Sequence, residues 1–577
     1  MLTICNEPVA PLTTLRSPRV WQTILNPELP GKIMLSHVQL NHALVHEEQQ
    51  DLDKRLLKLY GAVIAKFAAL HGESTRCFLV RAPESINLVG HHIKDFGGST
   101  NGIACYETVL CVSKRSDGKV SIAHLEERFA TSEFELLEGL PKARVLDWKA
   151  HVSQRAQPLT PNPSPPRGEG SNRAIRNALQ YYVNRHKGPT GQIELAIPGL
   201  NIVVGAILPA GYSSHSQTSL AAAALTAIMA ASGEWGQLPL SDFAAWLEEA
   251  QSGGHGRRSE IGPIVFGMAG EVVHTDWNPA RAKSKLLPHG FSFVSAHTGV
   301  KADCAHAAVP PSPLGGEGPG VRGSTPVDVL KTPAIRMTTT FAALALYKHL
   351  AQSGDVPMSD EDVYRVVAQI PERATRTELL ATFAAEPGRR NAGGTIRAVL
   401  DAHFKTHPEP PGGYNLREKL LFVLAEMRRA DRAAQVIRAG DAAALGALMN
   451  ISQAGEANFF HDVAPMGRIA QTLAIPSCVS DEEMLALADS AEPLWRQTGK
   501  SGASTPETDL LCDIASGVPG VLGARYCEPQ RVVILCKTEN VQILKDELIS
   551  GYYSPRGLAV NLVEQIYACQ GVGVLAV

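Results

Sequence analysis

The chain has 577 residues, of which 44% are hydrophobic and 19% charged, a composition typical of a globular protein with a sizeable core. Its 54 lysines and arginines nearly balance its 57 aspartates and glutamates, so the formal net charge is −3. Because no excess positive charge exists to release counterions from phosphates, this balance argues against a nucleic-acid or anionic-membrane binder. Disorder as the dominant state is also excluded.

The ten cysteines form no CxxC pair and no Cys/His cluster at metal-ligand spacing, so neither a structural zinc site nor a disulfide framework is indicated. The first residues, MLTICNEPVAPLTTLRSPRVW, lack the charged start and the apolar stretch of a signal peptide. No window reaches about 18 uninterrupted apolar residues. We therefore expect a soluble cytoplasmic protein.

The pattern along the chain predicts strands mixed with helices. An amphipathic helix is expected at Leu56–Phe67. Runs of β-branched and apolar residues bounded by turn formers predict strands at 77–82, 102–114 and 119–123, two more within 193–207, and others at 520–536 and 571–577. Helices are predicted at 219–231, 338–352, 415–438 and 441–453. This mixture predicts an α+β fold of mixed sheets, with helices packed on one side.

Two Pro/Gly-rich segments, 157–172 and 309–325, interrupt this pattern, and both carry SP followed shortly by GEG. Since Pro supplies no backbone donor and Gly loses much entropy on ordering, we expect exposed loops, inserted as one repeated element. A proline-rich ligand motif is the alternative. The expected organisation is a lead segment and helix at 1–75, a first domain at 76–285 with the first insert, and a second domain at 286–577 with the second insert.

The segment Arg81–Gly98, RAPESINLVGHHIKDFGG, is interpreted as a strand, a Pro-initiated turn, an apolar stretch and a polar cluster. Its adjacent histidines, His91 and His92, are a weak metal signal, because neighbouring strand residues face opposite sides of a sheet. Metal binding by this pair is therefore the less favoured interpretation.

The segment Leu208–Leu220, LPAGYSSHSQTSL, is a loop rich in Gly and hydroxyls that runs into an alanine-rich helix. Exposed backbone N–H groups and the positive helix end suit an anion, and the hydroxyls suit a phosphate or Mg²⁺. An ordinary Ser/Thr helix cap is the alternative explanation.

Taken together and in this order, these segments carry a family resemblance. The first is similar to the galactokinase substrate motif P-G-R-V-N-L-I-G-E-H-T-D-Y-N-G-G, with matches at Pro83, Asn87, Leu88, Gly90, His92, Gly97 and Gly98. The second resembles the phosphate loop of the GHMP kinase superfamily, P-x-G-x-G-L-S-S-S-S, with Pro209, Gly211, Ser216, Thr218 and Leu220 in register. Residues 266–270 and 519–527 are similar to the segment after the catalytic aspartate and to the third superfamily motif. The GARY sequence at 523–526, with the tail at 569–575, is similar to galacturonokinase-like sequences.

The resemblance implies a sugar 1-kinase that transfers the ATP γ-phosphate to the anomeric hydroxyl of a hexose or uronic acid, with ATP and Mg²⁺ as cofactors and a small-molecule sugar as partner. Such a reaction needs positioning and charge neutralisation more than covalent help. The implied cofactor-binding residues are Pro209, Gly211, Ser213, Ser214, Ser216 and Thr218. The implied substrate-binding residues are His91, His92, Lys94 and Asp95. Glu260 stands at the position of the catalytic aspartate, with Arg257 beside it, and Ser216 and Glu260 are the implied Mg²⁺ ligands.

The departures from the family pattern keep several alternatives open. Ser85 replaces the catalytic arginine and His91 the sugar-binding glutamate, and Glu528-Pro529-Gln530 replaces the Gly-rich third motif. Three alternatives follow. The chain is an active kinase in which Arg81, Arg257, Arg258 or Lys94 restores positive charge, or a catalytically impaired homologue that acts as a ligand-binding or regulatory protein. The third alternative is a pseudogene-like product that drifts under weak selection. Glu260 is either the base or a solvated charge beside Arg257 and Arg258. His91 and Lys94 would suit a negatively charged sugar. The oligomeric state is not predicted.

Overall fold

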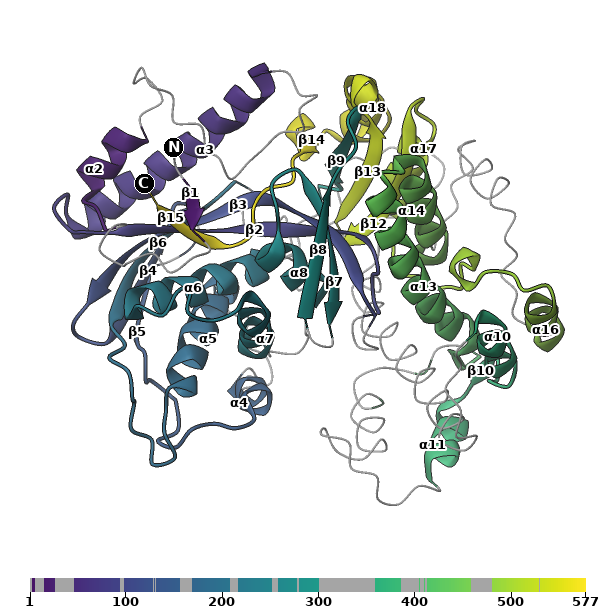
Figure 1. The fold of residues 1–577 in the computed structure, drawn as a ribbon, viewed down its shortest axis with the longest axis horizontal. Helices are drawn as coiled ribbons and strands as arrows, with labels where there is room; N and C mark the ends of the chain where they lie inside the picture. Colours follow the sequence, from purple (N-terminus) through teal and green to yellow (C-terminus); the bar gives the residue numbers. More distant parts are fainter. Residues whose placement is uncertain are drawn as a thin grey trace, which may run out of the picture.

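The computed structural model describes residues 3–5, 15–25, 46–93, 98–127, 129, 131–155, 169–207, 216–251, 258–277, 280–299, 359–384, 404, 409, 412–457, 480–528 and 530–576. Two large β-sheets, one on each side of the view in Figure 1, organise the described residues, and β10 and β11 form a separate two-stranded pair. Long helices pack on both sheets, and the two halves meet where the ends of β2 and β3 approach α13 and α14.

The first sheet has nine strands among the described residues, in the order β1-β15-β2-β3-β6-β4-β5, with β7 paired to β3 and β8 to β7. The strands are β1 (Thr3–Cys5), β2 (Phe78–Val89), β3 (Thr100–Arg115), β4 (Lys119–His124), β5 (Ser132–Glu135), β6 (Gly199–Ala206), β7 (Glu271–Trp277), β8 (Ala280–Leu286) and β15 (Gly573–Ala576). The pair β4 and β6 is parallel and the other pairs are antiparallel, so the sheet is mixed.

Helices cover both faces of this sheet, because successive strand residues point to opposite sides and both sets are apolar. Val80 and Leu110 face a core shared with the helices below the sheet in Figure 1, whereas Leu79 and Cys111 face a core built with α3 above it. The helices are α2 (Pro18–Ile24), α3 (His46–His71), α4 (Trp148–Arg155), α5 (Glu169–Arg185), α6 (Ser216–Ser232), α7 (Leu240–Ala250) and α8 (Arg258–Phe266). The predicted amphipathic helix is confirmed within α3, which buries Leu56, Leu57, Tyr60, Val63, Ile64 and Phe67.

The second sheet is antiparallel, in the order β12-β13-β9-β14. Its strands are β9 (Phe291–His297), β12 (Val521–Glu528), β13 (Arg531–Lys537) and β14 (Val563–Ile566). The helices against it are α14 (Ala442–Glu456), α17 (Pro506–Ser516) and α18 (Val541–Leu548), and α13 (Arg417–Ala439) packs on α14 and on the ends of β2 and β3. Side chains of β2, β3, α13, α14 and β13 share one hydrophobic core, so the end of β2 is fixed by both halves of the molecule.

Smaller elements lie at the far end of α13, away from the first sheet (Figure 1). They are α10 (Asp360–Ala368), β10 (Arg373–Ala374), α11 (Arg376–Ala384), β11 (Tyr414–Asn415) and α16 (Asp481–Asp489). Short 3-10 turns occur at Leu494–Arg496, Thr538–Asn540, Ser554–Arg556 and Val560–Leu562, and a π-turn occurs at Ile549–Tyr553. Over the described part of the chain, no helix has both the length and the apolar character needed to cross a membrane.

The predicted α+β class with mixed sheets is confirmed, but three details differ. The helices were expected on one side, and α3 covers the other face of the first sheet as well. Of the two strands expected within 193–207, only the second forms; the first run makes a single bridge, from Ile193 to Lys187, and Pro198 interrupts it. Glu169 begins α5, so the first insert ends earlier than residue 172. The expected helix at 338–352 and the second insert lie outside the described residues.

Candidate functional site

Strand β2 is the central support of the site, and every residue from Phe78 to Val89 is buried. The sequence predicted a turn at Pro83, but the strand continues through it. The register of the β2–β3 pair shifts by one residue between Ala82 and Glu84, and the extra residue belongs to β3, so Pro83 lies opposite a β-bulge. The ladder of hydrogen bonds is interrupted opposite the bulge, which suits Pro83 because Pro has no N–H to donate.

Beyond β2 the backbone bends so that the two adjacent histidines face the same way. Gly90 has φ 97°, where a Cβ would lie 2.6 Å from the carbonyl oxygen of Ser99, and His92 has φ 61°. The rings of His91 and His92 consequently lie 3.9 Å apart between centroids. Both approach Glu456 at the end of α14, with His91 Nδ1 at 3.6 Å and His92 Nε2 at 3.4 Å from Oε1. The expectation that these histidines face opposite sides is wrong, because positive φ breaks the strand alternation.

Glu426 of α13 holds this bend in place. Its Oε1 accepts hydrogen bonds from the backbone N–H of Gly90 at 2.8 Å and of His91 at 3.2 Å, and from the Ser452 hydroxyl at 3.0 Å. Its Oε2 accepts from Arg429 Nε at 2.6 Å, and both side chains are fully buried. Burial alone would raise the pKa of Glu426, but the positive charges of Arg429 and Arg525 outweigh it and lower that pKa to about 2.

A second contact joins two residues that the sequence assigned to different motifs. Thr218, in the first turn of α6, donates its hydroxyl hydrogen to a carboxylate oxygen of Glu260, in the first turn of α8. Thr218 is fully buried and Glu260 is 7% exposed, so the interpretation of Glu260 as a solvated charge is wrong. The next residue, Ser219, donates to the carbonyl oxygen of Ala82 at 3.1 Å, which fixes this pair against β2.

This arrangement can be compared with known structures. No protein-family model matches the sequence. A galactokinase from Lactococcus lactis, crystallised with galactose, is 15% identical, with a TM-score of 0.51, and the match covers 89% of this chain and 98% of that one. A Methanococcus jannaschii mevalonate kinase (11% identity, TM-score 0.39, 86% and 99% covered) and a Cytophaga hutchinsonii homoserine kinase (11%, 0.39, 86% and 97%) also match. The chain has the GHMP kinase fold.

Arg81, one of the residues expected to replace the positive charge that is missing at Ser85, is bonded to other groups in the structure. Arg81 Nε and Nη2 each donate to Glu107 at 2.6 Å, and Nη1 donates to the carbonyl oxygen of Gly571 at 2.9 Å. Arg81 is fully buried, so its charge stabilises the first sheet and its C-terminal strand. Arg81 therefore does not restore the charge at Ser85.

Sequence reasoning missed two arginines that bring positive charge to the same strand. Arg525 of β12 donates to the carbonyl oxygen of Leu88 at 3.0 Å. Arg531 of β13 lies 3.1 Å from Glu528 and 3.9 Å from Glu84, which is next to Ser85. Both arginines are buried in strands of mostly apolar residues, and a charged residue in such a run was the available signal. Glu528, which stands where the third motif is Gly-rich, is therefore paired with the positive charge of Arg531.

Several predicted site residues lie outside the described part of the chain. They are Lys94, Asp95, Pro209, Gly211, Ser213, Ser214 and Arg257. Ser216 is described only as the first residue of α6. The structure therefore brings together His91 with His92 and Thr218 with Glu260, and the roles assigned to all the site residues stay predictions.

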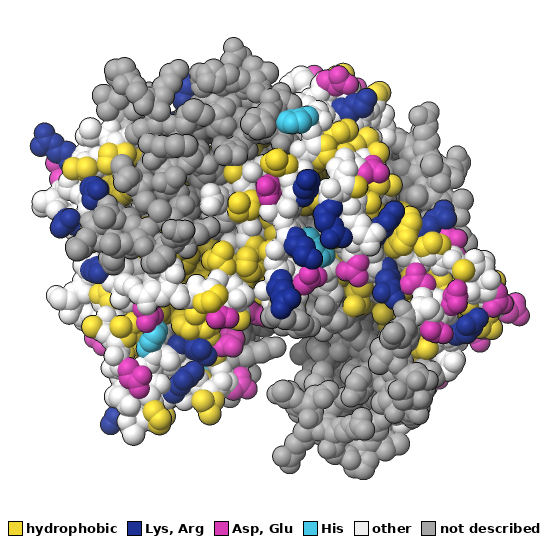
Figure 2. All heavy atoms as spheres, viewed as in Figure 1, with side chains coloured by type: hydrophobic (Ala, Val, Ile, Leu, Met, Phe, Trp, Pro, Cys, Tyr) yellow, Lys and Arg dark blue, Asp and Glu magenta, His cyan; other side chains and the backbone are white. Residues whose placement is uncertain are grey.

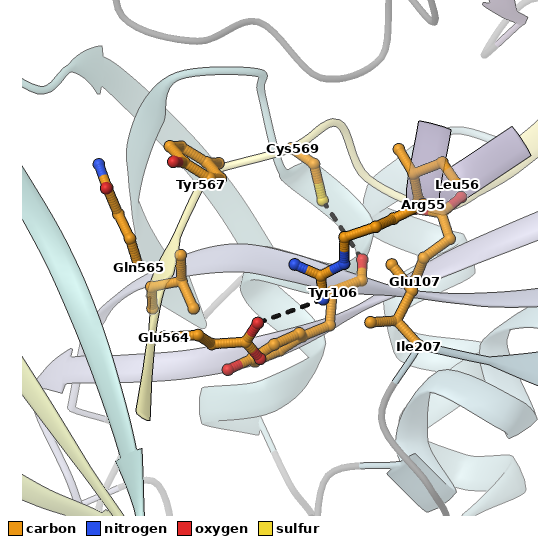
Figure 3. A pocket seen from close by; sticks show the side chains of 10 residues that line it. Arg55, Leu56, Tyr106, Glu107, Ile207, Glu564, Gln565, Tyr567 and Cys569 are labelled. Carbon is orange, nitrogen blue, oxygen red and sulfur yellow. Dashed lines mark hydrogen bonds and ion pairs between the residues drawn. The ribbon is translucent and has the colours of Figure 1, made fainter. Parts of the chain in front are cut away.

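The small cavity in Figure 3 does not belong to this site. It measures about 40 Å³, is lined by side chains of α3, β3 and β14, and contains no residue of either motif. The ion pair between Arg55 and Glu564, 3.2 Å long, closes one side (Figure 3). A cavity of this size holds a water molecule or two, not a sugar.

A wider hollow of about 200 Å³ lies between β8 and α13, next to the core that fixes the end of β2. Its lining residues include Lys283, Lys285, Arg438, His274 and Asp431. On the face shown in Figure 2, basic side chains gather around a histidine near the middle of the molecule, with acidic side chains beside them. The charge on this face is therefore mixed.

Proposed function

We propose that this protein is an ATP-dependent small-molecule kinase that phosphorylates the anomeric hydroxyl of a hexose or uronic acid. The observation that carries the proposal is the buried contact between Thr218 and Glu260 in a chain with the GHMP kinase fold. It joins the helix that follows the candidate phosphate loop to the candidate base. The resemblance of the motifs to galactokinases, together with the similarity to a galactokinase crystallised with galactose, supports a sugar as the acceptor.

The start of α6 would bind the phosphates of ATP. This helix has 17 residues, and its first N–H groups have no carbonyl partner within the helix, so they present positive partial charge to an anion. Pro209, Gly211, Ser213 and Ser214 precede this end in the sequence and would complete the loop around the phosphates.

Glu260 would act as the base. As the acceptor oxygen forms its bond to the γ-phosphorus and the bond to the β-phosphate oxygen breaks, the hydroxyl proton passes to the Glu260 carboxylate and ADP leaves. Thr218 holds that carboxylate in one orientation beforehand. Carboxylate and hydroxyl oxygens are the ligands Mg²⁺ prefers, so Glu260 and Ser216 suit the ion. When bound, Mg²⁺ would neutralise charge on the phosphates.

A second function is favoured by one observation. Ser85 is buried where the family motif has an arginine, and Arg81 is held by Glu107. A site without that cation would stabilise the transferred phosphoryl group less, although it would still bind a ligand. The second candidate is therefore a ligand-binding or regulatory protein derived from a kinase.

One experiment separates the two functions. ATP binding with Mg²⁺ is measured by titration calorimetry, and phosphate transfer to neutral and acidic hexoses is followed on the same sample. The variant Glu260→Gln removes the base and keeps the side-chain shape. The matched control is Glu249→Gln, because Glu249 also accepts a hydrogen bond from a hydroxyl, that of Tyr181.

We expect turnover that falls by about 10²–10⁴-fold in Glu260→Gln and is retained in Glu249→Gln. ATP binding without turnover on any sugar would favour the ligand-binding function. If the wild-type chain binds no nucleotide at all, the kinase proposal is overturned. Preference for galacturonate over galactose would support the acidic-sugar expectation for His91 and Lys94.

A further inference from the structure

We propose that His91, His92 and Glu456 form a binding site for one divalent transition-metal ion of the zinc type. Each residue offers one ligand atom, and the three atoms lie within 4.8 Å of one another. The histidine side chains are 14% and 15% exposed and Glu456 is fully buried, so the site is buried on one side and open on the other. Two imidazoles and one carboxylate with an open position are a ligand set that zinc takes in enzymes.

The distances between the ligand atoms fit this assignment. A tetrahedral ion with bonds of about 2.0–2.1 Å has ligand atoms about 3.4 Å apart. Glu456 Oε1 lies 3.6 Å from His91 Nδ1 and 3.4 Å from His92 Nε2. Two edges of the tetrahedron are therefore present, and the two histidine nitrogens, which form the third edge, lie within 4.8 Å of each other.

The backbone is fixed in the conformation that this site needs. The positive φ of His92 is unfavourable for a residue with a side chain. Glu426 holds the turn by accepting from the N–H groups of Gly90 and His91, and Arg429 holds Glu426. Such a maintained outlier indicates a functional constraint on where the rings point.

The carboxylate of Glu456 supplies a second, independent observation. It is fully buried, and within the described residues neither of its oxygens accepts a hydrogen bond. A buried ionised carboxylate is costly unless a cation or a donor satisfies it. A metal ion between Glu456 and the two imidazoles would do so.

Nearby cations limit the affinity of the site. Arg525 Nη2 lies 3.7 Å from Glu456 Oε1, beyond hydrogen-bond distance, while its Nη1 donates to Leu88. Lys419 also interacts with Glu456 through its charge. Because both compete with a metal for this carboxylate, we expect weaker binding than in a closed structural zinc site. They also favour an anion or an oxygen of the substrate at the open position.

This site differs in place and in chemistry from the proposed Mg²⁺ site. Thr218 and Glu260 are fixed near Ala82 of β2 through Ser219, whereas the histidines follow the end of the strand at Val89. Seven residues at about 3.3 Å each separate Ala82 from Val89 by roughly 23 Å along the strand. Imidazole nitrogen favours transition metals, whereas Mg²⁺ favours oxygen ligands.

The test titrates Zn²⁺ and Co²⁺ into chelator-treated full-length protein without nucleotide, using calorimetry for stoichiometry and the visible spectrum of Co²⁺ for coordination. The main variant is His92→Asn, because Asn tolerates positive φ and the fold is kept. His91→Gln is the second variant. The matched control is His186→Asn, since His186 Nε2 also lies close to a glutamate, 3.1 Å from Glu234.

We expect one ion per chain, a Co²⁺ spectrum of low coordination number with nitrogen ligands, and affinity lowered by about 10–100-fold or more in both site variants. The His186→Asn control should bind like the wild-type protein, and thermal midpoints should show that all variants are folded. Absence of stoichiometric binding to the wild-type chain, or equal affinity in His92→Asn and His186→Asn, would overturn the proposal. Because nucleotide is absent, a failure here is distinguishable from a failure of the kinase proposal.

Discussion

Replacement of Glu426 by Gln tests how much the buried charge network beside the histidine turn stabilises the fold. The substitution keeps an oxygen that can accept from the N–H groups of Gly90 and His91, but it removes the negative charge paired with Arg429. Arg429 is fully buried and would be left without its counter-charge. We therefore expect a large loss of stability at neutral pH.

The expected loss of unfolding free energy follows from the pKa of Glu426. The interactions of Glu426 lower its pKa from 4.5 to about 2, and at 1.36 kcal/mol per unit this corresponds to about 3 kcal/mol. Breaking a buried ion pair by removing one partner costs about 3–5 kcal/mol, which agrees. Because the folded-state pKa is depressed, this stability is present above pH 4.5 and is lost as the pH falls toward 2.

The assay is urea unfolding of wild-type and Glu426→Gln protein across this pH range. The difference in unfolding free energy should be largest above pH 4.5 and shrink as the pH approaches 2. Glu133→Gln is the control, since Glu133 pairs with Arg115 at 3.0 Å but is 48% exposed, and it should change stability by about 1 kcal/mol or less. A difference for Glu426→Gln that matched this control, or that did not shrink in acid, would refute the reasoning.

Three further predictions concern packing and charge. Arg81→Met leaves Glu107 buried without its cation and should lower the urea-unfolding free energy by about 3–5 kcal/mol; a change below 1 kcal/mol would contradict it. Gly446→Ala in α14 puts a Cβ 2.6 Å from the β12 backbone and should lower stability by about 1–3 kcal/mol, whereas Gly61→Ala in α3 meets nothing within 4 Å and should raise it by up to about 1 kcal/mol. If Gly446→Ala and Gly61→Ala change the thermal midpoint equally, the close approach of Gly446 to β12 is not what determines the loss of stability. Burial lowers the pKa of Lys419 from 10.5 to about 8. Between pH 8 and 10.5 the native state has therefore lost the Lys419 proton while the unfolded state still holds it, so the unfolding free energy of the wild type relative to Lys419→Met should rise over this range. An unfolding free-energy difference that stays constant from pH 8 to 10.5 would contradict this prediction.

The sequence predicted most of the strands and helices because their signals are local. Alternating or continuous apolar runs gave β3, β4 and the β12–β13 pair, and alanine and leucine content gave α6. The turn expected at Pro83 was wrong because pairing of β2 with β3 on both sides of the bulge outweighs the local preference of Pro. That pairing involves a partner strand that local reasoning does not weigh.

The candidate site was only partly predictable, for a similar reason. Glu260 and Thr218 were identified by motif resemblance, but their contact was not foreseen. Glu426, which supports the histidine turn, is 336 residues from Gly90, and no local pattern marks it as a partner. The shared orientation of His91 and His92 depends on positive φ, which the residue type His does not favour.

Because of the position of β15, the first sheet cannot be completed until the C-terminal half of the chain has been synthesised. This strand pairs with β2 and β1 in the first sheet, yet it follows every strand of the second sheet along the chain (Figure 1). During synthesis, β2 therefore presents an unpaired edge until the second half has been made, and exposed edges favour association with other chains. We expect that the chain produced without residues 567–577 would aggregate, and that supplying the missing strand as a peptide would reduce this aggregation.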